Sequence, residues 1–105
     1  MVYLIITDRL TPEGKENFKK VLEWQRRLDK WLASHGAIYK SVRHFTTLIG
    51  EPVYETWLEY PNYSAFDEDD EKAKEFAKSP EFQELISQMN KYFERINSRV
   101  VKEIV

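Results

Sequence analysis

The sequence contains no cysteine, and its 105 residues include only three glycines and four prolines. The absence of cysteine excludes disulfides, thiolate metal sites and cysteine nucleophiles. Only Gly14 follows the first predicted strand, so the glycine-rich loop that cradles phosphate groups is missing. No apolar run is long enough to cross a membrane, and the opening MVYLIITDRL lacks the basic segment of a signal peptide. We therefore expect a cytoplasmic protein.

The charges are balanced and well interspersed. A net charge of −2 arises from 16 basic and 18 acidic residues, which argues against nucleic acid or an anionic membrane as the main partner. His35 and His44 are the only histidines and have no second ligand at metal spacing, so no metal site is predicted. The acidic run 67–71 lacks the glycine and spaced oxygens of a calcium loop, and we interpret it as a solvated helix start.

The stretch from Ala37 to Tyr60 is typical of a long β-hairpin and forms the centre of the predicted fold. Val, Ile, Thr, Tyr, Phe and Trp dominate it, and Gly50-Glu51-Pro52 interrupts it near its middle. Because Pro52 has a fixed φ and Glu51 does not favour a positive φ, we predict a three-residue loop. The resulting cross-strand pairs are Ile49 with Val53, Thr47 with Glu55, Phe45 with Trp57 and Arg43 with Glu59.

Both faces of this hairpin carry apolar side chains. One face presents Phe45 and Trp57 beside Arg43, and the other presents His44 and Leu58. A sheet with one side in water alternates polar and apolar residues more cleanly than this. We therefore expect both faces to be covered in the folded protein.

Helix-start signals divide the rest of the chain. Thr11-Pro12-Glu13 combines a hydroxyl cap, proline at the first helical position and an acid in the first turn. Asn62 is a second cap, and Ser79-Pro80 breaks the following helix and restarts it. Besides the hairpin, the predicted elements are a strand at 2–10, a helix at 12–34, a helix from 63 that restarts at 80 and ends at 97–98, and a strand at 99–105.

The order of elements is β-α-β-β-α-β, the arrangement of an α+β ferredoxin-like fold. Residues 1–105 form a single domain in this interpretation, with both helical segments on one face of a four-stranded antiparallel sheet. The other face would leave several hundred Å² of apolar surface in water, which soluble monomers rarely tolerate. We therefore predict a homodimer in which two sheets stack face to face.

Three stretches resemble the dimeric α/β-barrel superfamily, in particular its antibiotic-biosynthesis-monooxygenase and NIPSNAP-like branches. They are the strand and helix entry YLIITDRLTPEGK at 3–15, Glu55-Thr56-Trp57, and the helix restart AKSPEFQ at 77–83. The resemblance implies a pocket between sheet and helices with a strand tryptophan in it. It would place the Trp57 face toward the helices and the His44 face toward the partner subunit.

The haem-degrading branch of the superfamily also resembles this chain at Trp57. Its pocket asparagine corresponds to Asp8, and its helical haem-ligand histidine would fall near Ile86, which adds Ile86 to the predicted pocket. Phe76 stands where a histidine often precedes the Ser-Pro restart. No cofactor is predicted, and haem binding through His44 remains a separate hypothesis.

Seven residues are the predicted site. Asp8, Arg43 and Glu55 are the catalytic candidates, and Trp57, Phe45, Gln25 and Ile86 are the substrate-binding candidates. Trp57 and Phe45 would stack on an aromatic substrate, or they form a cross-strand core pair. Arg43 and Glu55 mark a site if they point inward, and they are solvated if they lie at strand ends.

The two remaining polar candidates have equally open roles. Asp8 serves as a general base if burial raises its pKa, or it caps the loop before Thr11. Gln25 lies inside the apolar arc of its helix, where it orients a ligand carbonyl or bonds a backbone group at the sheet edge.

The sequence therefore predicts a small-molecule-binding homodimer with no nucleic-acid or membrane partner. As an enzyme it would resemble the cofactor-independent monooxygenases, with Arg43 stabilising an enolate or phenolate of an aromatic or carbonyl metabolite. The alternatives are a non-catalytic binding or assembly module of the same fold, and a haem-binding protein. A sheet–helix cavity of about 300 Å³ or more would favour the binding function over pure subunit packing.

Overall fold

The computed structural model describes residues 1–105 and contains four strands and four helices. The strands form one antiparallel sheet in the order β2-β3-β1-β4, with β1 in the interior. This topology confirms the predicted α+β ferredoxin-like fold. The elements are β1 (Val2–Leu10), α1 (Pro12–Glu16), α2 (Phe18–Ser34), β2 (Ser41–Thr46), β3 (Tyr54–Tyr60), α3 (Tyr63–Phe76), α4 (Pro80–Tyr92) and β4 (Phe93–Lys102).

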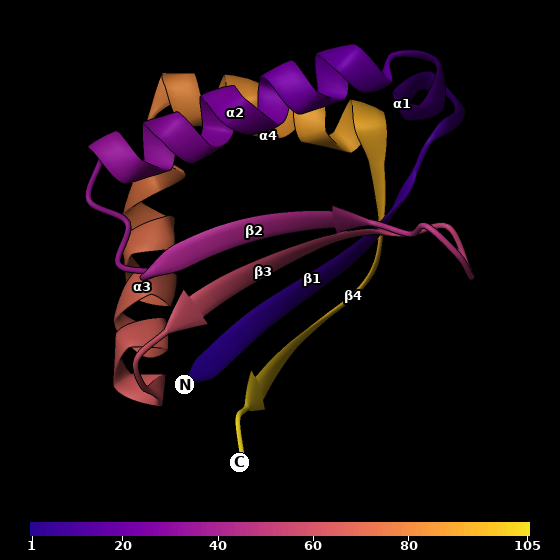
Figure 1. Ribbon diagram of the computed structural model, residues 1–105. Helices are drawn as coiled ribbons and strands as arrows, with labels where there is room; N and C mark the ends of the chain where they lie inside the picture. Colours follow the sequence, from indigo (N-terminus) through magenta and orange to yellow (C-terminus); the bar gives the residue numbers. More distant parts are fainter.

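The helices lie on one side of the sheet (Figure 1). Helices α2 and α4 run side by side above it, and α3 stands across one end of the strands. The opposite face of the sheet, which we call the open face, is covered by no element of the chain. None of the helices is long and apolar enough to cross a membrane.

The first helical segment is not continuous as predicted. It breaks at Asn17, where φ is −117° and ψ is 40°, into the short α1 and the long α2. The Thr11 hydroxyl accepts a hydrogen bond from the Gly14 amide at 3.0 Å and donates to the carbonyl of Lys91 at 2.8 Å. A Cβ on Gly14 would lie 2.5 Å from the Tyr92 carbonyl oxygen. The break therefore lets α1 dock on the C-terminal end of α4.

The boundary between the last helix and the last strand was predicted six residues too late. The strand β4 begins at Phe93 and not at Arg99, so residues 93–98, which were expected to be helical, belong to the sheet. Residues 93–102 pair with β1 along its whole length, with one bulge opposite Thr7 and Asp8. Phe93 also packs on the rings of Trp24 and Tyr54, at centroid distances of 5.6 and 4.8 Å. Sheet pairing and core packing thus outweigh the local helical periodicity.

The hairpin is present, but its register differs from the prediction. Arg43 lies opposite Trp57 and Phe45 opposite Glu55, a shift of two residues from the expected pairs. The connection is longer than predicted because residues 47–53 lie outside the strands, where the Thr47 hydroxyl accepts from the Val53 amide at 3.0 Å. A shift of an even number of residues keeps every side chain on its expected face. The division into two faces is therefore confirmed.

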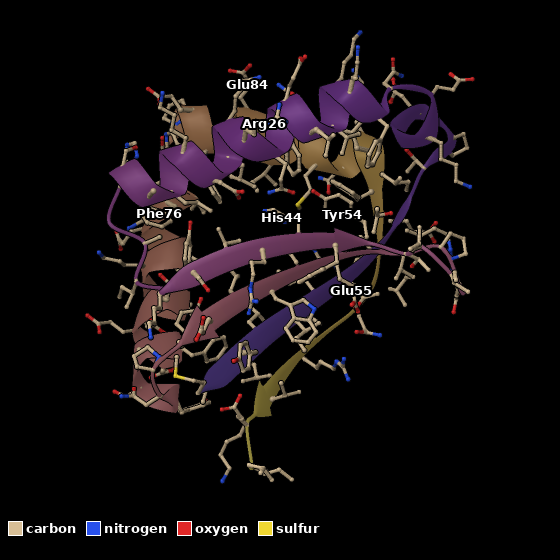
Figure 2. The ribbon with its side chains drawn as sticks, in the orientation of Figure 1. Arg26, His44, Tyr54, Glu55, Phe76 and Glu84 are labelled. Carbon is tan, nitrogen blue, oxygen red and sulfur yellow. The ribbon has the colours of Figure 1, made fainter.

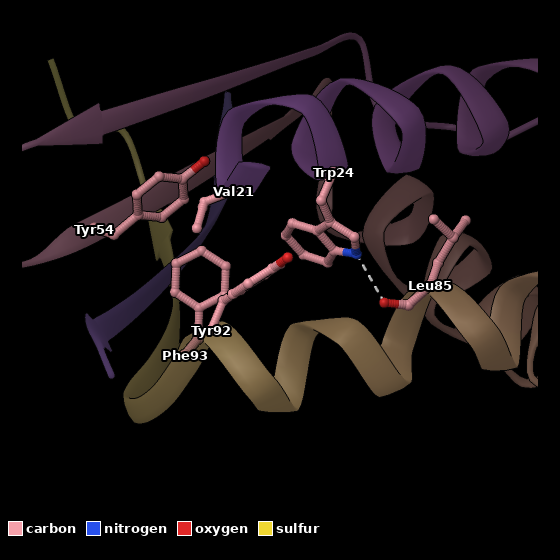
Figure 3. Packing of buried hydrophobic residues seen from close by; sticks show 6 residues of the cluster. All are labelled: Val21, Trp24, Tyr54, Leu85, Tyr92 and Phe93. Atoms are coloured by element: carbon pink, nitrogen blue, oxygen red, sulfur yellow. Dashed lines mark hydrogen bonds between the residues drawn. The ribbon is translucent and has the colours of Figure 1, made fainter. Parts of the chain in front are cut away.

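The hydrophobic core lies where α2 and α4 meet the loop end of the hairpin (Figure 3). The Trp24 indole N–H donates to the Leu85 carbonyl at 2.8 Å, which ties α2 to α4. The six buried residues of the core are Val21, Trp24, Tyr54, Leu85, Tyr92 and Phe93. Only 13 of the 105 residues are buried in the single chain, so this core is small for the length of the protein.

Candidate functional site

The sheet faces the helices with the side opposite to the one expected. His44 and Tyr54 point to the helix layer, whereas Glu55 points away from it (Figure 2). The Tyr54 hydroxyl donates to Gln25 on α2 at 2.9 Å, and His44 Nε2 lies 2.7 Å from an Asp29 carboxylate oxygen on the same helix. The expected orientation of the Trp57 face toward the helices is therefore wrong, because polar partners on α2 match the His44 side of the hairpin.

Four of the predicted site residues do come together, but on the open face. The Trp57 ring meets the Phe45 ring edge-on at 5.6 Å and the Tyr3 ring at 5.8 Å. Glu55 accepts a hydrogen bond from the Thr7 hydroxyl at 2.9 Å and one from the Trp57 indole at 3.5 Å. Arg43 is exposed and directly opposite Trp57 in the sheet, and Phe45 is 45% exposed. Arg43, Phe45, Glu55 and Trp57 thus form an aromatic and charged surface, with no helix over it.

A cavity of about 190 Å³ lies on the other side, between the sheet and helices α2, α3 and α4. Ile86, one of the substrate-binding candidates, lines it, and Phe76 beside the C-terminal end of α2 closes one wall (Figure 2). The volume is below the expected 300 Å³, although the space is not filled by side chains. The apolar lining residues are Leu4, Leu28, Leu32, Ala37, Tyr39, Leu58, Tyr60, Phe66, Ala73, Phe76, Phe82 and Ile86.

The polar end of this cavity is built around Asp69. One Asp69 oxygen accepts from the Tyr60 hydroxyl at 2.6 Å and the other from the Ile38 amide at 2.8 Å. The Tyr39 hydroxyl is buried there without a hydrogen-bond partner. Burial, together with the carboxylates of Asp29 and Asp69, raises the pKa of Tyr39 to about 12.

Asp69 was missed as a site residue because it belongs to the acidic run interpreted as a solvated helix start. The residues around it in the run are exposed, whereas Asp69 is half-buried. A helical spacing signal was available, since Asp69 lies three residues after Phe66 and four before Ala73, both of which line the cavity. Periodicity would therefore have separated Asp69 from its exposed neighbours.

Gln25 has a structural partner on the sheet and does not line the cavity. Its amide accepts from Tyr54 and donates to Asp29 at 3.0 Å, and Asp29 in turn binds His44. The other ring nitrogen of His44 lies 2.8 Å from the Thr56 hydroxyl. Burial, followed by the nearby carboxylates, raises the pKa of Tyr54 well above its ordinary value. This chain of hydrogen bonds fastens α2 to the hairpin.

Asp8 is buried near the bulge of β1 and does not line the cavity. The Arg95 guanidinium donates to its carboxylate at 2.6 Å. Burial raises the pKa of Asp8, and the hydrogen bond and charge of Arg95 oppose that rise. The loop before α1 is capped by Thr11 itself, so Asp8 does not serve as its cap. The three catalytic candidates, Asp8, Arg43 and Glu55, are thus absent from the cavity lining.

The geometry defines a ferredoxin-like α+β chain with one helix-covered and one open sheet face. Solved structures of the same fold include a NIPSNAP domain protein from Burkholderia xenovorans, with a TM-score of 0.71 and 19% identity over 99% of this chain and 95% of that chain. An antibiotic biosynthesis monooxygenase has a TM-score of 0.61 and 19% identity over 100% and 99% of the two chains. HapK from Hahella chejuensis has a TM-score of 0.67 and 13% identity over 99% and 93%.

At the level of sequence, no protein-family model and no curated protein matches the chain. The low identities mean that the likeness to these structures concerns the fold. At that level, the predicted resemblance to the NIPSNAP-like and antibiotic-biosynthesis-monooxygenase branches is confirmed.

Proposed function

We propose that the protein is a homodimer that binds a small, largely apolar molecule in the cavity between its sheet and helices. The observation that carries this proposal is the cavity itself, because 12 of its 14 lining residues are hydrophobic and its polar groups gather at one end. Pockets for small molecules commonly combine apolar walls with a few placed polar groups. The similar folds of a NIPSNAP domain protein and an antibiotic biosynthesis monooxygenase support the choice of this cavity.

Binding is better supported than monooxygenase-like catalysis. Arg43 and Glu55, two of the three catalytic candidates, lie on the face of the sheet away from the cavity. Asp8 already has Arg95 as its partner. A general base must reach its proton within hydrogen-bond distance or through one water. The geometry therefore favours a binding module, and catalysis would require a second substrate site on the open face.

Haem binding through His44 is less well supported. Both ring nitrogens of His44 already have partners, Asp29 and Thr56. A haem iron would have to displace one of them, and His44 does not line the cavity. A Soret band after reconstitution with haem, lost in His44→Ala, would restore this hypothesis.

The exposed area supports the homodimer. The single chain exposes 7071 Å², whereas a monomer of 12.6 kDa is expected to expose about 6,200 Å². The surplus of roughly 900 Å² per chain is close to the roughly 800 Å² that each partner buries in a standard interface.

The open face is the natural place for that interface. Tyr3, Phe45 and Trp57 form its aromatic centre. Arg43 on β2 and Arg99 on β4 make no ion pair within the chain. A second copy supplies carboxylates for these cations, and interfaces are enriched in such aromatic and arginine side chains.

The binding proposal is tested by unfolding the freshly purified protein and identifying the small molecules it releases by mass spectrometry. Ala73 lines the cavity, so the ring in Ala73→Phe occupies the space and should abolish co-purification. Ala33→Phe places the same ring at a position on α2 that does not line the cavity, and it serves as the matched control. Equal release from both variants would show that the molecule binds elsewhere.

A further inference from the structure

We propose that the cavity selects its ligand by charge: it takes an aromatic molecule without a negative charge, and it rejects the matching carboxylate. This inference rests on the proposed binding function and names the class of ligand for the same cavity. Two observations lead to it, namely the apolar walls and the charges at the cavity.

The walls define an apolar ligand of about one ring. The cavity of about 190 Å³ is somewhat larger than an engineered apolar cavity of about 150 Å³ that binds benzene. Phe66, Phe76 and Phe82 contribute aromatic rings from α3 and α4. Offset and edge-to-face contacts with such rings favour an aromatic guest.

The charges at the cavity are of one sign. Asp69 and Asp70 are its only charged lining residues, and no lysine, arginine or histidine lines it. Asp69 is held in place because both of its oxygens accept hydrogen bonds. An anionic ligand would enter a poorly hydrated space beside carboxylates with no cation to compensate it. The carboxylates at the cavity therefore discriminate against an anionic ligand by repulsion.

The test is a titration followed by methyl NMR signals of Leu28, Leu58 and Ile86, which line the cavity. The probes are acetophenone, benzoate and ethylbenzene, which share a phenyl ring and differ in charge and in acceptor. We expect acetophenone to bind at least about tenfold more tightly than benzoate.

Two variants of α3 test whether the discrimination against benzoate comes from the carboxylate at the cavity or from the net charge of the protein. Asp69→Asn keeps an acceptor for the Ile38 amide and should reduce the difference in affinity between acetophenone and benzoate. Asp67→Asn removes the same charge from an exposed residue that does not line the cavity. It should leave the difference in affinity between acetophenone and benzoate unchanged.

The outcomes distinguish the two proposals. If acetophenone and benzoate bind equally well at the cavity methyls, charge selection is overturned and the binding function stands. If none of the three probes shifts the cavity methyls, the binding function fails, and the inference fails with it.

Discussion

Trp57 is expected to be the main contact between two subunits, and its removal should separate them. It lies at the centre of the open face, between the rings of Tyr3 and Phe45. Truncation of a central interface tryptophan typically costs about 2–4 kcal/mol. Trp57→Ala should therefore weaken the dimer roughly 30- to 700-fold in Kd.

The expected loss of affinity in Trp57→Ala is consistent with the surface area that the single chain exposes. A surplus of roughly 900 Å² per subunit gives a standard-size interface, in which a few aromatic and arginine side chains carry most of the binding energy. Trp57 is only half-buried in the single chain, so the subunit itself should lose little stability. The effect should thus appear in the association and not in the folding of the chain.

The assay is sedimentation equilibrium over a range of protein concentrations, with thermal unfolding measured in parallel. Tyr63→Ala is the matched control, because Tyr63 is an aromatic residue that is 63% exposed and belongs to α3 and not to the sheet. The wild type and Tyr63→Ala should have the mass of two chains at micromolar concentration, and Trp57→Ala should have the mass of one. A wild-type mass of one chain, or an unchanged mass in Trp57→Ala, would refute the reasoning.

Three further predictions concern the subunit. Gly14→Ala should destabilise the fold by about 1–3 kcal/mol in urea unfolding, because the new Cβ meets the Tyr92 carbonyl at 2.5 Å; an unchanged midpoint would contradict this close approach. Tyr54→Phe should cost about 1–3 kcal/mol by the same assay, since it leaves the buried acceptor oxygen of Gln25 unsatisfied. The pKa of Asp8 is raised above 3.8 in the folded state, so ionisation of Asp8 disfavours folding as pH rises through the folded pKa. The stability of Asp8→Asn relative to wild type should therefore rise with pH in that window, and a pH-independent difference would show that the pKa is not raised.

Element types and their order were predictable because they depend on local signals. Thr11, Asn62 and the Ser79-Pro80 pair mark helix starts that the structure confirms. The alternation of side chains along the hairpin also predicted correctly which residues share a face. These features follow from capping and from the period of two in a strand, which require no knowledge of distant contacts.

The orientation of the sheet was not predictable from the hairpin, because both of its faces carry aromatic and polar residues. What decides it is the pairing of Tyr54 and His44 with Gln25 and Asp29 on α2. Such pairs join residues 15–29 positions apart and leave no local pattern in the sequence. The resemblance to a family with a pocket tryptophan then assigned Trp57 to the wrong side.

The polar end of the cavity escaped prediction for a related reason. Asp69 and Tyr39 come from α3 and from the loop before β2, and only the fold brings them beside the same cavity. Ile86 belongs to the regular apolar stripe of α4, and it lines the cavity. Apolar lining therefore follows from periodicity, whereas the few polar groups that give specificity depend on tertiary contacts.

The most direct test of the binding function is a comparison of acetophenone titrations of wild type and Ala73→Phe, followed by methyl NMR. We predict saturable shifts at Leu58 and Ile86 in the wild type and none in the variant, because the new ring occupies the cavity. Shifts confined to residues of the open face, or equal shifts in both proteins, would contradict a ligand site between the sheet and the helices.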